Sequence, residues 1–154
     1  MKPLFDFAGK SALGTWMSNS RYGFPAFEMV HLLGLGLLLG SVLLLNARFF
    51  GLGLRRQTAA EVASDLAPWT RLALVLMAFS GIPLFASKAP DLWSEELGTF
   101  ALKMSLIVTG VAFHYWVQVP LARSGNSTWG RPAAAFSLLV WLGAAVAGLS
   151  LEFL

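Results

Sequence analysis

The chain of 154 residues is 56% hydrophobic and 12% charged, and its mean hydropathy is +0.67. A soluble domain carries roughly 25% charged residues, so this composition indicates a membrane protein. The absence of cysteine excludes disulfides, thiolate metal sites, iron–sulfur clusters and covalently attached haem, and the net charge of +3 is too scattered among apolar segments to indicate nucleic acid as a partner.

The N-terminal segment, residues 1–24, lacks the continuous apolar core of a secretory signal. Leu13, Trp16 and Met17 fall on one face of a helix, and Asp6 precedes them as a candidate N-cap. We therefore expect one interfacial helix lying on the bilayer, followed by a first membrane span that serves as an uncleaved anchor.

Four apolar stretches follow, each long enough to cross about 30 Å of hydrocarbon as a helix. They cover residues 24–47, 67–87, 99–119 and 133–151. The predicted fold is therefore all-α, a single integral membrane four-helix bundle over residues 1–154 with the interfacial helix at its N-terminus. The connection at residues 48–66 contains RRQTAAEVASDL, which predicts a short polar helix between the first two spans.

Prolines and basic residues mark the ends of these spans. Pro25 and Pro68 are expected to open the first two spans, Pro120 to close the third, and Pro83 is a candidate kink in the second. Six arginines lie on the side of the first and third loops, against four basic residues on the side of both termini. The positive-inside rule then places the first and third loops in the cytoplasm and both termini on the outer side of the membrane.

The only two histidines both lie inside predicted spans, at different depths. His31 lies on the side of the termini and His114 on the opposite side, so their α-carbons differ in depth by roughly 15 Å. Two histidines that share one haem iron have α-carbons about 12–13 Å apart, mostly across the porphyrin, because iron–nitrogen bonds are about 2 Å long. We therefore expect each histidine to serve a separate site.

The first predicted site is a b-type haem at His31. Glu28 and Gly34 lie one turn away on the same helix face, and Lys103 on the third span is level with His31. His31 would bind the iron, Gly34 would leave room for the ring, Lys103 or an arginine would hold the propionates, and Glu28 or a backbone carbonyl would orient the imidazole. The second axial ligand could be Met104 or Met29, could come from a partner, or could be absent.

The second predicted site surrounds His114. Arg48, Asn46, Tyr115 and Gln118 lie at comparable depth and could hold a second haem or a quinone headgroup. The alternatives are that the histidines join helices by hydrogen bonds, that Lys103 snorkels or pairs with Glu28, and that the glycines serve helix packing. No catalytic residue is expected, because no acid except Glu28 is within reach of either histidine.

Several segments resemble an uncharacterised group of bacterial four-helix membrane proteins, from about residue 18 to residue 154. They are PAFEMVHLLG around His31, NAR ending at Arg48, LAPWTRLALVLMAFSGIPLFAS, and FALKMSLIVTGVAFH. The layout is more distantly similar to the HemJ-type protoporphyrinogen oxidase and to the copper-resistance D and membrane cytochrome b group. The resemblance implies a haem-associated protein in which His31 and Lys103 are the functional pair.

The sequence therefore predicts a membrane protein that binds one or two haems b and transfers electrons between a periplasmic partner and the quinone pool. It is expected to be an electron-transfer subunit rather than a stand-alone enzyme, together with other membrane subunits or a second copy. The alternatives are a HemJ-type porphyrinogen-oxidising enzyme, with Lys103 or Arg48 on the propionates, and a cofactor-free membrane subunit or transporter.

Overall fold

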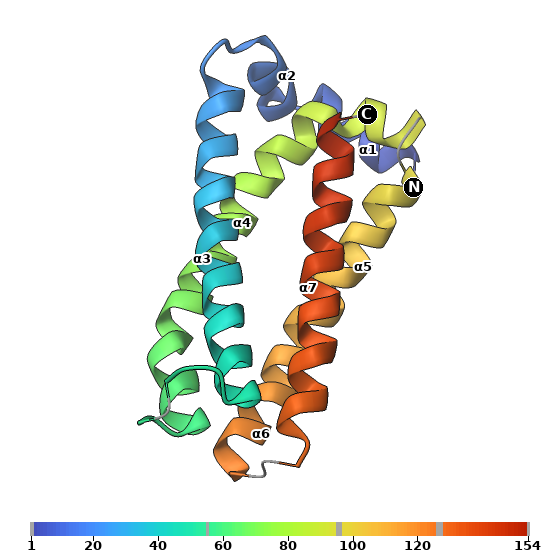
Figure 1. The fold of residues 1–154 in the computed structure, drawn as a ribbon. Helices are drawn as coiled ribbons and strands as arrows, with labels where there is room; N and C mark the ends of the chain where they lie inside the picture. The colour runs from blue at the N-terminus through green and yellow to red at the C-terminus, as the bar shows by residue number, and fades with distance from the viewer. Residues whose placement is uncertain (1, 55, 95–96, 126–127, 154) are drawn as a thin grey trace. The chain divides into compact units, whose positions relative to one another are not determined.

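The computed structural model describes residues 2–54, 56–94, 97–125 and 128–153, and these residues form helices joined by short connections, with no strand among them (Figure 1). The elements in chain order are α1 Lys2–Lys10, α2 Ala12–Asn19, α3 Gly23–Phe50, α4 Ala59–Ser94, α5 Leu97–Phe113, the π-helix η1 His114–Gln118, α6 Val119–Ser124 and α7 Gly130–Phe153.

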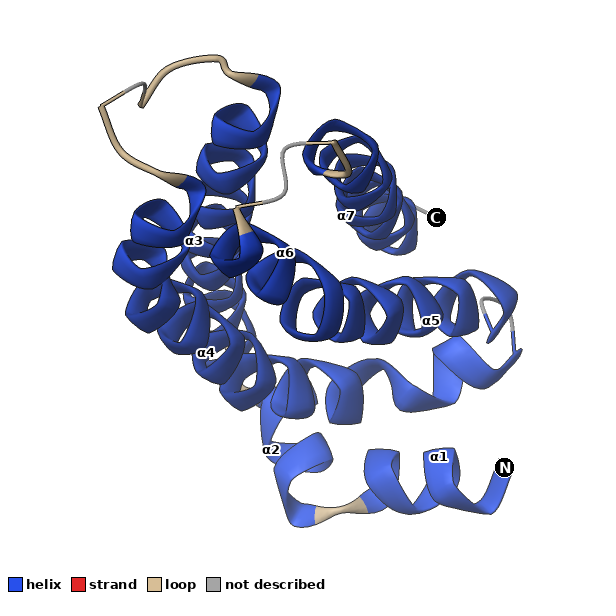
Figure 2. Ribbon diagram, turned by 90° about the horizontal axis from the view of Figure 1, so that it is seen from below, coloured by secondary structure: helices blue, strands red, loops and turns tan. Residues whose placement is uncertain are grey.

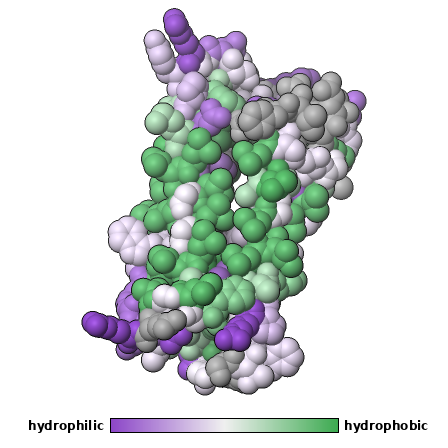
Figure 3. All heavy atoms as spheres, viewed as in Figure 1, coloured by the Kyte–Doolittle hydropathy of each residue, from purple (hydrophilic) through white to green (hydrophobic). Residues whose placement is uncertain are grey.

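The four predicted membrane spans are confirmed as long apolar helical segments. They are Gly23–Phe50, Ala59–Pro90, Leu97–Ser124 and Gly130–Ser150. Only 11–39% of the residues in the most apolar window of each segment are buried inside the protein. Figure 3 shows hydrophobic residues over the middle of the long helices and hydrophilic residues toward their ends. So much outward-facing apolar surface indicates that a lipid bilayer surrounds the helices.

The predicted separate polar helix in the first connection is wrong, because its AAEVASDL portion forms the first turns of α4. Thr58 and Glu61 form a capping box: the Thr58 backbone N–H donates to Glu61 Oε2 at 2.6 Å, and the Glu61 N–H donates to Thr58 Oγ1 at 3.2 Å. This cap starts the helix before Pro68, which lies inside α4 rather than at its beginning.

The expectation that Pro120 closes the third helix is also wrong. The helix widens into the π-turn η1, where the Val119 N–H bonds to the His114 carbonyl five residues earlier, and then continues through Pro120 as α6. Proline has no N–H and crowds the preceding turn, and a π-turn is one way for a helix to pass it. The helix ends instead at Gly125, which has a φ of 67°.

The N-terminal segment forms two short helices where one was expected. Asp6 lies inside α1 and is not an N-cap; the cap of α2 is Ser11, whose Oγ accepts from the Gly14 N–H at 3.0 Å. Met17 is buried, whereas Phe7 and Trp16 are 75% and 53% exposed. Met17 therefore faces the interior of the first unit, whereas the position of this segment on the bilayer surface stays a prediction.

Contacts group the chain into two compact units, Met1–Leu37 with Arg71–Gly98, and Leu38–Thr70 with Thr99–Leu154. In the first unit, α1 and α2 pack on the end of α4. A Cβ on Gly9 would lie 2.8 Å from Pro90 Cγ, and Phe5 contacts Phe85 edge-to-face with ring centroids 5.3 Å apart. Missing side chains at the glycines thus allow the short helices to lie close to α4.

The second unit contains the end of α3, the beginning of α4, and α5 to α7. Its core includes Leu45, Val62, Ala63 and Ala122. The helix of α5, η1 and α6 runs alongside α7 (Figure 2), and a Cβ on Gly110 would lie 2.9 Å from Trp141 Cε2. The expectation of one domain over residues 1–154 stays a prediction.

Candidate functional site

His31 lies half-buried on α3 and is held by a serine of α4. Its Nδ1 lies 2.9 Å from Ser80 Oγ, and the Ser80 hydroxyl donates to the Leu76 carbonyl at 2.6 Å. A hydroxyl has a single hydrogen, so Ser80 Oγ accepts from His31 and the ring proton lies on Nδ1. The unprotonated nitrogen of neutral His31 is therefore Nε2, the atom that can bind a metal ion.

Two glycines let the helices meet at this bond. A Cβ on Gly81 would lie 3.3 Å from His31 Cε1, so the imidazole lies against the backbone of α4. A Cβ on Gly34 would lie 3.2 Å from both Leu76 Cβ and Met77 Cγ. Gly34 thus serves close helix packing in this structure, which is the alternative that the sequence left open for it.

The remaining residues of the first predicted site belong to both units. Glu28 lies half-buried on α3 in the unit of His31, whereas Lys103 and Met104 lie on α5 in the second unit. The Lys103 side chain runs along α7, where a Cβ on Gly148 would lie 3.3 Å from its Nζ. The predicted pairing of Lys103 with His31, and Met104 as an axial ligand, stay predictions.

His114 belongs to a buried polar network that joins three helical segments of the second unit. Gln118 Nε2 donates to Asn46 Oδ1 at 2.8 Å, Asn46 Nδ2 donates to Ser137 Oγ at 3.2 Å, and the Ser137 hydroxyl donates to Gln118 Oε1 at 3.2 Å. These three bonds close a ring in which each side chain both donates and accepts. We call Asn46, Gln118 and Ser137 the amide ring; all three are at most 1% exposed.

The amide ring also fixes the tautomer of His114. Its Nδ1 lies 3.4 Å from Gln118 Oε1, an oxygen that can only accept, so Nδ1 carries the proton and Nε2 does not. The π-turn brings His114 and Gln118 to the same buried side of the helix. Both histidines of the protein therefore have Nδ1 as donor to another side chain and Nε2 as the basic atom.

Two residues predicted near His114 have other contacts. Arg48 Nε donates to the Gln57 carbonyl at 2.6 Å and so braces the connection between α3 and α4. Tyr115 packs its ring edge-on to His114, with centroids 5.0 Å apart, and is 38% exposed. Of the residues predicted here, Asn46 and Gln118 share the network of His114.

Ser80 and Ser137 were not among the predicted site residues. Each is a lone serine in an apolar helix, and most such serines only bond to their own backbone. Ser137 could have been recognised from its position on the helix, because it lies on the same face of α7 as the buried residues Ala133, Val140 and Trp141. A polar residue on a buried stripe within a membrane needs a partner on another helix.

The donor set limits the metal chemistry. Across the described ranges, no group of three or more His, Cys, Asp or Glu side chains could hold a metal ion. A haem requires less of the protein, because the porphyrin supplies four ligands and one imidazole completes the attachment. Single, oriented histidines therefore fit a haem better than a bare metal ion.

Comparison with known proteins gives one match. The model of DUF6644, a family of unknown function, matches residues 4–154, and the chain belongs to this family. No curated protein and no solved structure is significantly similar to the chain. The match to DUF6644 brings no link to the HemJ-type or copper-resistance D groups.

Proposed function

We propose that this member of DUF6644 is a membrane protein that binds b-type haem through Nε2 of His31 and transfers electrons between a periplasmic partner and the quinone pool. The observation that carries the proposal is the hydrogen bond from His31 Nδ1 to Ser80 Oγ. A histidine that binds a metal almost always donates its other ring N–H to a protein acceptor, which fixes its tautomer and its orientation.

Ser80 is suited to that orienting role. It is fully buried, and its own hydroxyl bond to Leu76 directs its lone pairs away from the α4 backbone. When bound, haem would supply one-electron transfer. The residues of the chain would hold and orient it, with His31 on the iron.

His114 has a narrower role in the proposal than the sequence suggested. The amides of Asn46 and Gln118 are engaged with each other and with Ser137, so they are poor donors for a quinone headgroup. Nε2 of His114 is then the atom of this group best suited to an added ligand, either a second haem or a quinone oxygen. A quinone oxygen would require a proton on Nε2, whereas iron requires none.

The proposed membrane is the bacterial inner membrane with both termini in the periplasm. The arginine bias supports this orientation, since Arg56, Arg123 and Arg131 are exposed on or near the first and third loops. His31 would then lie nearer the periplasmic surface, which is why a periplasmic protein is the proposed electron donor.

An optical spectrum tests the proposal. The full chain, produced with an adequate haem supply and extracted in mild detergent, should show a Soret band and a sharp α band on reduction. His31→Ala should abolish the spectrum at this site, whereas Leu33→Ala, two residues away at an exposed position, should leave it unchanged. A colourless, folded wild-type protein would contradict haem binding.

A second candidate is a cofactor-free membrane subunit, and the amide ring favours it. A closed set of interhelical bonds at His114 is what a purely structural role would look like, and hydrogen bonds of this kind join helices within membranes. The two candidates differ at His31: a structural histidine there would leave the isolated protein without a haem spectrum.

A further inference from the structure

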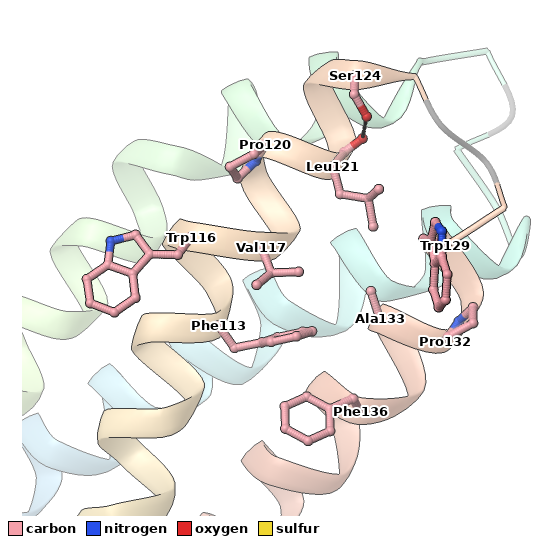
Figure 4. A pocket seen from close by; sticks show the side chains of 10 residues that line it. All are labelled: Phe113, Trp116, Val117, Pro120, Leu121, Ser124, Trp129, Pro132, Ala133 and Phe136. Carbon is pink, nitrogen blue, oxygen red and sulfur yellow. Dashed lines mark hydrogen bonds between the residues drawn. The ribbon is translucent and has the colours of Figure 1, made fainter.

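An apolar groove lies on the second unit, between the helix of α5, η1 and α6 and the beginning of α7 (Figure 4). Its volume is about 540 Å³. The residues that line it are Phe113, Trp116, Val117, Pro120, Leu121, Ser124, Trp129, Pro132, Ala133 and Phe136.

The groove has aromatic walls and one polar end. Phe113 and Phe136 pack against each other across it, with ring centroids 4.6 Å apart. The Ser124 hydroxyl, at the far end, donates to the Leu121 carbonyl at 2.9 Å, so even this polar group is engaged by its own helix (Figure 4). The lining therefore suits a hydrocarbon chain and offers little to a polar molecule.

Two arginines adjoin the polar end of the groove in the sequence. Arg123 and Arg131 are both exposed, and each directly adjoins a residue that lines the groove, Ser124 and Pro132 respectively. The acidic side chains described in this unit, Glu61 and Asp65, lie on α4 and bond to Thr58 and Gln57. Neither lines the groove or adjoins a residue that does, so the described charged residues next to its lining are the two arginines.

Trp129 indicates where this end lies in the membrane. It is 64% exposed, and exposed tryptophans concentrate at the level of lipid headgroups. The groove thus begins at the headgroup region, beside two arginines, and continues along apolar side chains of two membrane-spanning helices.

We propose that this groove binds one anionic phospholipid, with an acyl chain between the two helical walls and the phosphate held by Arg123 and Arg131. Arginine is suited to phosphate because its guanidinium can donate two parallel hydrogen bonds. The site does not include His31 or the amide ring, and the proposal does not depend on haem binding.

Native mass spectrometry of the full chain, released from nanodiscs that contain equal amounts of phosphatidylglycerol and phosphatidylcholine, tests the proposal. The wild type should retain phosphatidylglycerol preferentially. In Arg123→Gln/Arg131→Gln, retention of phosphatidylglycerol should fall by about thirtyfold, the effect of removing two cations near a phosphate. Val117→Trp, which fills the groove from an exposed position, should lower the retention of both lipids.

The matched control is Lys10→Gln/Arg56→Gln, which removes the same charge from exposed positions that do not line the groove. Circular dichroism should show the helical content of every variant to be that of the wild type. Equal retention of both lipids by the wild type, an equal loss in the control, or unchanged retention in Val117→Trp would overturn the proposal.

Discussion

His31 and Ser80 lie on different helices, and the 2.9 Å hydrogen bond between them has a fixed direction because the Ser80 hydroxyl is already donated to Leu76. Its consequence is chemical: the nitrogen of His31 that remains basic is Nε2. An imidazole that is merely buried could adopt either tautomer, whereas this one is held in the tautomer that binds iron in the usual way.

The variant Ser80→Ala tests this orienting role. We expect haem retention to fall by about 10- to 100-fold while the Soret maximum stays near its wild-type position, because the ligand remains but its tautomer and orientation are no longer fixed. Retention is measured as the loss of Soret absorbance to apomyoglobin over time. Ser105→Ala is the control, since Ser105 is exposed and its hydroxyl donates to the Ala101 carbonyl of its own helix. Equal haem loss from both variants would contradict the role.

Removal of Gln118 should destabilise the second unit. In Gln118→Ala, the amide of Asn46 and the hydroxyl of Ser137 lose partners while they remain buried, at a cost of about 1–3 kcal/mol for each unsatisfied group. Thermal unfolding in detergent micelles measures the effect. Gln57→Ala removes a half-buried glutamine whose bond to Asp65 is exposed, and it should cost far less.

A double-mutant cycle tests whether the amide ring acts as one unit. If it does, Asn46→Ala/Gln118→Ala should destabilise the protein by less than the two single variants added together, because the second substitution removes a group that the first left unpaired. Additive effects would show that the two amides act independently.

Glycine substitutions should separate close helix contacts from open positions. Gly110→Ala should destabilise the second unit by about 1–3 kcal/mol, because its Cβ would lie 2.9 Å from the rigid, 4% exposed indole of Trp141. Gly36→Ala is the matched substitution within α3, since nothing described lies within 4 Å of a Cβ at this position. The higher helix propensity of alanine should therefore raise the free energy of unfolding by about 0.5–1 kcal/mol. Thermal unfolding distinguishes them, and equal shifts would contradict the packing at Gly110.

The capping box at the start of α4 gives a local prediction. Thr58→Ala removes the side-chain acceptor for the Glu61 N–H and should cost about 0.5–2 kcal/mol. Hydrogen exchange of the first turns of α4 measures the loss as faster exchange there. Thr109→Ala, at an exposed threonine that bonds to the Ser105 carbonyl, should leave exchange in α4 unchanged.

The membrane spans could be predicted from the sequence because their signal, a long run of apolar residues, depends on composition alone. Their ends could not. Pro68 was expected to begin a helix and Pro120 to end one. Instead, a capping box at Thr58 starts α4 before Pro68, and a π-turn at His114 carries the third span through Pro120. Such local hydrogen bonding depends on geometry that an apolar run does not encode.

The candidate site was predicted in the same partial way. His31 and His114 stood out because ionisable residues are rare in membrane spans. Ser80 and Ser137 did not stand out, because a serine in an apolar helix can donate its hydroxyl to a carbonyl of the same helix and therefore costs little there. Gly34 was expected beside a ring, but a missing side chain has the same appearance in a sequence whether a cofactor or a second helix fills the space.

The π-turn also sets the rotational register of everything that follows it on the third span. The turn holds one residue more than an α-helical turn, because the Val119 N–H bonds five residues back rather than four. Deletion of one residue between His114 and Gln118 would therefore restore ordinary α-helical winding and leave α6 near its present rotation about the axis. The same deletion in the α-helical part of α5 would instead turn everything after it by about 100°, and Ala122 would leave the core that it shares with Leu45. A one-residue deletion should therefore be tolerated better in this five-residue segment than earlier on the third span.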